Sequence, residues 1–385
     1  MEGMKLYYAT NRKHSGKDRW HSDFYGAFFS DDGRENLRFG ELTVNVEKAK
    51  VDKYLNAKVS NEIGNGEGLS AYIAKCARSA QIVAYQEKIS DMLDIHQPNA
   101  KFGSKEMFNN LMEEMKKHTD VLIFIHGFNV SWYNAVGSAL ALQTMLNRPG
   151  IGDKEQKVLV VLFSWPSDGT AFAYVSYLSD RSDAKGSGYA FGRGILKLRD
   201  FLVDLSNEAK RRNVPLCGHN IHLLCHSMGN YVLQKALDKI VHFSSSLAPL
   251  PRIFEHIFLC AADVDDNVLE SNQPMSRLHE LCQYVNIYYN QQDKALTISD
   301  YTKGNPTRLG TGGAAHPSLL HTKIHHVDCT PIVHGIIEHS YYLWGPVNED
   351  IRLSIDGLDF DNAQKHRRKK DNIIPNVWKM CGRRK

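Results

Sequence analysis

The chain lacks several features that would place it in well-known classes of protein. Its seven cysteines form no CxxC pair, so nothing indicates a metal or redox site built on paired thiols. No apolar run is long enough to cross a bilayer, and there is no internal repeat or low-complexity segment. With 42% hydrophobic residues, the chain has enough apolar material for one large core or two modest ones. These absences favour a globular protein whose free thiols pack as small hydrophobic groups in a reducing compartment.

The chain also has little excess charge. The formal net charge is +4, and part of it comes from basic clusters at 366–370 and 383–385. No aromatic-interleaved recognition motif accompanies these clusters, so we expect no nucleic-acid partner. Near the N-terminus, polar residues interrupt the chain before an apolar segment of signal length forms, and we expect a cytoplasmic protein. We expect one domain over 1–350, with N-terminal strands and a helical segment over 1–115, a catalytic core over 116–350, and a polar basic tail over 351–385.

Continuous apolar runs alternate with helical patterns along the core. Such runs are typical of strands that are covered on both faces, which occur in parallel sheets. Helical spacing between them predicts helices, notably over 135–146, 192–205 and directly after residue 229. The alternation predicts an α/β fold with a mostly parallel, doubly wound sheet and helices on both faces. The predicted buried strands cover 121–125, 158–163, 220–226, 257–261, 284–289 and 324–329.

The N-terminal part has a different pattern. Alternating apolar and polar residues over 37–46 predict a half-exposed antiparallel strand. Residues 68–93 have apolar positions at helical spacing, and we expect a helix there.

The run that ends in Cys225-His226-Ser227-Met228-Gly229 predicts a strand followed by a sharp turn into a helix. Such a turn holds its serine in a strained backbone conformation, so the residues two before and two after must be small. Cys225 and Gly229 meet this need. The stretch resembles the nucleophile elbow of the α/β-hydrolases, with cysteine where glycine is commonest. The first turn of the helix would point the amide of Met228 at a group bound on Ser227.

A second loop follows the first buried strand, at His126-Gly127-Phe128-Asn129. In α/β-hydrolases this place supplies the other half of the oxyanion hole, and Gly127 would let the backbone approach the substrate closely. We therefore expect the amide of Phe128 to act together with that of Met228. His126 is expected to be structural because it precedes the nucleophile, whereas the general base follows it in this fold. Asn129 either supports the loop or is a simple turn residue.

A serine nucleophile needs a histidine base and a carboxylate that holds this base in the right tautomer. In this fold both follow the serine in the chain. Asp293, just after a buried strand, is the favoured acid, and Asp263, Asp265 and Asp266 are its rivals. His339, in a loop after the last predicted strand, is the favoured base, and His334 is its rival.

Many ordered segments are similar to the α/β-hydrolase family catalogued as domain of unknown function 900. The resemblance implies the α/β-hydrolase fold and hydrolase chemistry of undefined substrate, and it puts Ser227, Asp293 and His339 in the triad positions. The segments that carry it are Tyr8-Ala9-Thr10-Asn11-Arg12, Phe39-Gly40, His126-Gly127-Phe128-Asn129, Phe163-Ser164-Trp165-Pro166-Ser167, His226-Ser227-Met228-Gly229-Asn230, Ala261-Ala262-Asp263-Val264-Asp265, Asp293-Lys294-Ala295-Leu296 and His339-Ser340-Tyr341-Tyr342.

Other signals are weaker. Trp165 follows a buried strand at the carboxyl edge of the sheet and either forms a wall of the substrate pocket or packs in the core. His321, His325 and His326 do not have the spacing of a metal site, because adjacent residues of a strand point to opposite faces. We expect no cofactor and a small-molecule acyl substrate.

The expected activity is hydrolysis of a carboxylic ester, as in a carboxylesterase or lipase-like enzyme. A thioesterase or an amidase would use the same triad. The alternative from another class is a catalytically silent hydrolase fold that serves as a binding or effector module. The sequence leaves the oligomeric state open.

Overall fold

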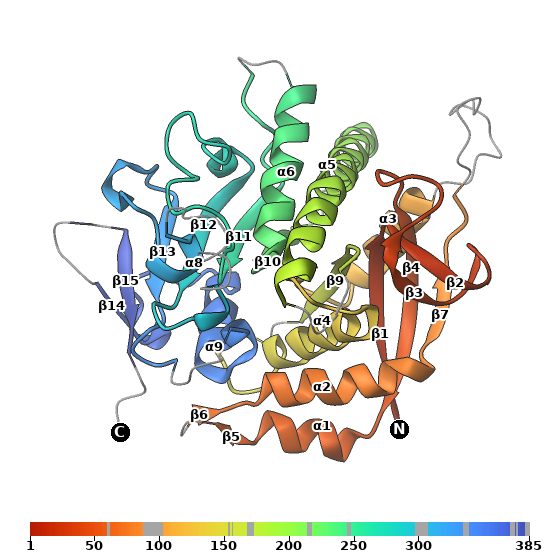
Figure 1. Cartoon of the computed structure of the whole chain (residues 1–385), viewed down its shortest axis with the longest axis horizontal. Helices are drawn as coiled ribbons and strands as arrows, with labels where there is room; N and C mark the ends of the chain where they lie inside the picture. The colour runs from red at the N-terminus through yellow and green to blue at the C-terminus, as the bar shows by residue number, and fades with distance from the viewer. Residues whose placement is uncertain are drawn as a thin grey trace.

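The computed structural model describes residues 1–59, 62–87, 103–152, 155, 157–167, 173–213, 218–244, 248–296, 307–333, 339–369, 374 and 376–381. Within these residues, one large sheet crosses the molecule (Figure 1). Its strands are β1 Glu2–Thr10, β4 Arg38–Val46, β7 Gln81–Ala84, β8 Asp120–Ile125, β9 Val158–Ser164, β10 Asn220–His226, β11 Phe254–Cys260, β12 Cys282–Tyr289, β13 Ile324–Asp328, β14 Arg367–Lys369 and β15 Val377–Met380.

The order of these strands is β14-β15-β13-β12-β11-β10-β8-β9-β1-β4-β7. The parallel pairs are β1 with β9, β9 with β8, β8 with β10, β10 with β11, β11 with β12, β12 with β13, and β13 with β15. The antiparallel pairings are those of β1 with β4, β4 with β7, and β14 with β15. The predicted mostly parallel sheet is therefore confirmed, as is the antiparallel strand near the N-terminus. Two short hairpins accompany the sheet: β2 Arg12–Asp18 with β3 His21–Phe29, and β5 Lys58–Val59 with β6 Glu62–Ile63.

Helices cover both faces of the sheet (Figure 1). One face carries α3 Gly103–Met115, α5 Ala173–Arg212 and α6 Gly229–Phe243; the other carries α1 Lys48–Leu55, α2 Gly66–Cys76, α4 Trp132–Leu146 and α9 Gly345–Ile355. Val121 and Ile125 face the first layer, whereas Leu122 and Phe124 face the second, because alternate residues of a strand point to opposite faces. This two-sided burial explains the continuous apolar runs. In the part of the chain that the structure describes, no helix is long and apolar enough to span a bilayer.

The remaining helical turns are short. They are the four-residue helix α8 Leu309–Gly312 and the 3₁₀ turns η1 Ala77–Ser79, η2 Leu278–Glu280, η3 Pro317–Leu319, η4 Tyr341–Leu343 and η5 Ala363–Lys365.

The helix predicted over 68–93 is too long. Helix α2 ends at Cys76, one 3₁₀ turn follows, and Gln81–Ala84 form the edge strand β7. Positions 73, 77 and 80 fit a helical period, but pairing with β4 gives the backbone of β7 its hydrogen bonds and leaves Val83 exposed at the edge. Residues 88–93 lie outside the described part.

The C-terminal segment also differs from the polar basic tail expected over 351–385. Most of α9 is buried, and β14 and β15 extend the sheet beyond β13. Arg367 explains why a basic cluster can lie here, since its guanidinium pairs with the buried carboxylate of Asp350. The same guanidinium donates to the hydroxyl of Tyr288 at 3.0 Å. A buried pair satisfied in this way lets a charged segment join the sheet.

Candidate active site

Ser227 lies in a strained turn between β10 and α6. Its φ of 52° lies in the left-handed region, a backbone conformation that residues other than glycine rarely adopt. The strained turn predicted from the sequence requires such a conformation. The amide of Ser227 donates to the carbonyl of Cys260 at 3.0 Å, and its carbonyl accepts from the amides of Asn230 and Asp263. At Gly229, a Cβ atom would come within 2.7 Å of the carbonyl of His126, so the small residue is needed for close packing. The surrounding backbone thus holds the serine in its unusual conformation.

The loop after β8 meets this turn. A Cβ atom at Gly127 would lie only 2.8 Å from the Cβ of Ser227, so the loop can approach the serine because residue 127 is glycine. Among the described residues, the amides of Phe128 and Met228 have no hydrogen-bond partner. The two amides follow Gly127 and Ser227 directly in the chain. Neither amide is engaged by another described group.

His339 and Asp293 lie together beside the turn. Nδ1 of His339 donates to Oδ2 of Asp293 at 2.7 Å, and the side chain of Asp293 is almost completely buried. The other carboxylate oxygen of Asp293 accepts from the amide of Ala295 at 3.0 Å, which holds the carboxylate in position. Nε2 of His339 makes no hydrogen bond within the part of the chain that the structure describes. With Nδ1 protonated and bound, Nε2 is the ring nitrogen that can accept a proton.

His226 connects Ser227 to His339, a role that the sequence did not reveal. Its Nε2 donates to the carbonyl of His339 at 3.2 Å, and the two rings lie 4.7 Å apart between centroids. The ring of Tyr342 packs against His226 at the same centroid distance. Burial, and then the proximity of His339, lower the pKa of His226 well below its ordinary value. A neutral His226 next to the serine therefore fixes the backbone of the loop that carries His339.

The rival carboxylates have other partners. Asp263 accepts a hydrogen bond from Tyr177 at 2.9 Å and lies between the guanidinium groups of Arg181 and Arg308. Asp265 pairs with Arg308 as well. Desolvation, followed by the charge of Asp265, raises the pKa of Asp266. The carboxylate that is bound to His339 is therefore Asp293. The rival histidine, His334, lies outside the described residues.

The buried side chain of Arg12 binds the loop after β8. Its Nη2 donates to the carbonyl of Val130 at 2.7 Å, and its Nε donates to Oγ of Ser164 at 2.8 Å. His126 joins this network, because its Nδ1 donates to the carbonyl of Gly127 and its Nε2 lies 3.2 Å from Oγ of Ser164. Burial, and then the charge of Arg12, lower the pKa of His126 to about 3. These contacts give His126 the structural role expected from sequence.

Asp180 of α5 also binds this loop. Its carboxylate accepts from the amide of Asn129 at 3.1 Å and from the hydroxyl of Ser167. Oγ of Ser167 in turn accepts from the amide of Val130 at 3.1 Å. Asn129 has a φ of 58°, so the loop needs such external contacts to keep its shape. The sequence carried no signal for Asp180, which is one of several acidic residues on a long helix.

Trp165 packs behind the loop. Its side chain is fully buried, its Nε1 donates to the carbonyl of His126 at 2.9 Å, and its ring stacks on that of His126. This position fits the packing alternative and leaves Trp165 without a surface for substrate contact.

Glu67, in the first turn of α2, is a further residue near His339 that the sequence did not indicate. Desolvation raises the pKa of Glu67, and the nearby His339 opposes part of this shift. Together with Ser340 and Trp344, Glu67 lines a small cavity of about 30 Å³ beside the histidine loop. An acidic side chain thus lies at this border of the candidate site.

The described residues contain no group of three or more histidine, cysteine or acidic side chains that could hold a metal ion. Of the histidines weighed for a metal, His325 packs against Phe360 and Trp378, and His321 stacks on His279.

The chain was compared with protein families, curated proteins and solved structures. The family model described as an alpha/beta hydrolase of unknown function (DUF900) matches residues 101–351. The uncharacterized protein alr1448 of Nostoc sp. (strain PCC 7120) is 25% identical over 241 residues, and the match covers 51% of this chain and 58% of that protein. The match therefore spans little more than half of the relative. No solved structure matches the chain.

Proposed function

The chain belongs to the DUF900 family of α/β-hydrolases, and we propose that it is a serine hydrolase that cleaves an ester-type acyl bond. The observation that carries this proposal is the 2.7 Å hydrogen bond between His339 and buried Asp293, beside a serine in a strained turn. These groups come from three separate loops at the carboxyl ends of β10 and β12 and after β13. Such a meeting of a base, its acid and a constrained serine supports nucleophilic catalysis.

In the proposed mechanism, Oγ of Ser227 attacks the carbonyl carbon of the substrate while Nε2 of His339 takes its proton. Asp293 stabilises the imidazolium that forms and keeps Nδ1 protonated. The amides of Phe128 and Met228 stabilise the negative oxygen of the tetrahedral intermediate. His339 then protonates the leaving group, which departs and leaves the acyl group on Oγ of Ser227. A water molecule attacks this acyl carbon while Nε2 of His339 takes its proton, and His339 returns the proton to Oγ of Ser227 as the carboxylic acid is released.

An ester is the proposed substrate because it is the most reactive of the common neutral acyl bonds. Thioesters and amides can be attacked by the same groups. A screen of short- and medium-chain p-nitrophenyl esters against matching thioesters and anilides distinguishes these substrates.

The variant Ser227→Ala tests the proposal. Loss of a triad nucleophile lowers turnover by about a million-fold, while the fold should remain intact. The control is Ser79→Ala, in an exposed turn outside the site, which should keep the activity of the wild type. Esterase turnover that is equal in Ser227→Ala and wild-type protein would contradict the mechanism.

A further inference from the structure

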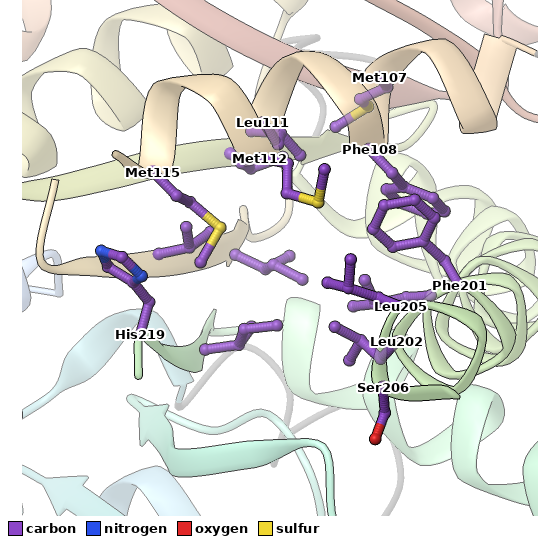
Figure 2. A pocket seen from close by; sticks show the side chains of 15 residues that line it. Met107, Phe108, Leu111, Met112, Met115, Phe201, Leu202, Leu205, Ser206 and His219 are labelled. Carbon is purple, nitrogen blue, oxygen red and sulfur yellow. The ribbon is translucent and has the colours of Figure 1, made fainter. Parts of the chain in front are cut away.

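An apolar cavity of about 300 Å³ lies between α3 and α5, against one face of the sheet (Figure 2). Three methionines of α3, Met107, Met112 and Met115, line it together with phenylalanine and leucine side chains from both helices. Ser206 and His219 are the polar residues among those that line it. The cavity is at the lower end of the size range of small-molecule sites, which are mostly apolar with few polar groups.

This cavity is separate from the candidate active site. The strand residues that line it include Val121 of β8 and Ile221 of β10, which lie at the amino ends of these strands. Ser227 follows the carboxyl end of β10, six residues after Ile221. At about 3.3 Å per residue, the two points are roughly 20 Å apart. A molecule in the cavity would therefore be bound away from the serine.

The lining is suited to a flexible chain. Phe108 and Phe201 pack against each other at one side, with ring centroids 5.2 Å apart, while Met115 and His219 lie on the opposite side (Figure 2). Methionine side chains are unbranched and polarizable, so they adapt to a ligand without a fixed shape. The volume equals that of roughly ten water molecules at about 30 Å³ each, and a methylene group is of similar size. The space fits an unbranched chain of roughly ten carbons.

Positive charge lies near the amino edge of the sheet, where the two helices end. Helix α5 ends in Lys210-Arg211-Arg212, and α3 is followed by Lys116 and Lys117. Three of these cations pair with carboxylates: Lys116 with Glu113, Lys117 with Glu114, and Arg212 with Glu208. Lys210 and Arg211 form no ion pair within the described residues. The local excess of positive charge favours an anionic group next to the cavity.

We propose that this cavity binds an unbranched acyl chain of roughly ten carbons that carries an anionic head group, as in a fatty carboxylate. The chain occupies the space between α3 and α5, and the head group lies near the basic ends of the two helices. This site does not depend on the proposed hydrolase activity, because it shares no residue with the serine, histidine or aspartate described above.

The first test is calorimetric titration of the full chain with saturated carboxylates of six to fourteen carbons, below their micellar concentrations. Affinity should rise about four-fold for each added methylene, and it should level off at roughly ten carbons when the cavity is full. Decyltrimethylammonium, which has the same chain with a cationic head, should bind at least about ten-fold more weakly than decanoate. Absence of carboxylate binding, or equal binding of the two head groups, would overturn the proposal.

Variants locate the bound chain. Ser206→Trp adds bulk to the wall of the cavity and should weaken decanoate binding at least about ten-fold. The matched control is Val203→Trp, at an exposed position of the same helix, which should bind like the wild type. Met112→Ala enlarges the cavity and should move the plateau to chains longer by roughly three carbons, the number of heavy atoms removed. Esterase turnover should not change in Ser206→Trp.

The catalytic site is the other place where a carboxylate with an apolar chain could bind. If Ser206→Trp and Met112→Ala, both folded, bind the whole carboxylate series as the wild type does, the chain lies elsewhere and the proposal is wrong. A second titration measures carboxylate binding to protein whose Ser227 carries a phosphonate, which blocks the catalytic site. Binding should be unchanged by this modification, and its loss would place the chain at the serine. The titrations of the unmodified protein and of its Ser206 and Met112 variants need no reactive serine, so failure of the hydrolase proposal leaves them intact.

Discussion

Among single residues, the carboxylate that accepts the hydrogen bond from Nδ1 of His339 decides the assignment of the acid. Asp293 and the acids around 263–266 both follow buried strands, β12 and β11. The structure joins Asp293 to Nδ1 of His339, whereas Asp263 is held by Tyr177 and two guanidinium groups. These contacts assign Asp293, and not Asp263, to His339.

We predict that Asp293→Asn lowers turnover by roughly three to four orders of magnitude. The amide keeps the shape of the side chain but favours the wrong tautomer of His339. KM should change much less. The comparison is Asp263→Asn, which removes a buried charge from between two guanidinium groups and should lower the melting temperature more than the turnover. A crippled Asp263→Asn enzyme of normal stability, beside an active Asp293→Asn enzyme, would refute this assignment.

At the scale of elements, the loop after β8 shows how the scaffold shapes the candidate site. Gly127 brings this loop against Ser227, and Arg12, near the N-terminus, and Asp180 of α5 bind the backbone of the loop. These residues are far apart in the chain, so their joint role emerges only from the fold. A loop with such support can keep the amide of Phe128 in a fixed position.

We predict that Asp180→Asn lowers kcat about ten- to hundred-fold and changes KM much less. The neutral amide is a weaker acceptor for the amide of Asn129 and the hydroxyl of Ser167, so the loop becomes less ordered. The loss should not exceed the effect of removing an oxyanion-hole donor, about a hundred- to a thousand-fold. Asp200→Asn, which changes an exposed carboxylate of the same helix, is the control. A lower melting temperature with unchanged kcat would show that Asp180 has a role in stability alone.

The elements that were predicted best are those whose signal is local. The strand at 121–125 and the turn at Ser227 were recognised because two-sided burial and a strained backbone leave a pattern in neighbouring residues. The end of α2 and the strands β14 and β15 were missed because distant partners decide them. Val83 belongs to a strand only through β4, and Arg367 is buried only because Asp350 and Tyr288 receive it. For the same reason, His226 was recognised as part of a motif but not as the partner of the His339 loop.

At the scale of the whole molecule, the protein contains histidines that are buried in their neutral form. Burial is the main cause that lowers their pKa values, to about 3 for His126 and His325 and to about 4 for His326. The pKa values of His226 and His256 are also lowered, well below the ordinary value. In the unfolded chain these groups titrate near pH 6.5. Between about pH 6.5 and 4, the unfolded chain therefore binds more protons than the folded protein does.

We predict that the protein loses stability as the pH falls through this window. Above about pH 6.5 these histidines are neutral in both the folded and the unfolded state, so they do not reduce the free energy of unfolding there. The slope is at most about 1.4 kcal/mol per pH unit for each such histidine. Thermal melting at pH 8, 7, 6 and 5 checks the direction of the effect. His326→Leu removes one titrating group, so its melting temperature should fall less steeply with acidification than that of the wild type. Equal slopes for the two proteins, or a melting temperature that is constant from pH 7 to 5, would contradict this explanation.

If Ser227 is an activated nucleophile, a fluorophosphonate should label it covalently. Peptide mass spectrometry of the labelled wild-type protein should find one phosphonate on Ser227, with the fluoride lost. Ser227→Ala should remain unlabelled, and Asp293→Asn should react much more slowly because its histidine is in the wrong tautomer. Folded wild-type protein that is not labelled at all, or that carries the phosphonate on another residue, would contradict the claim.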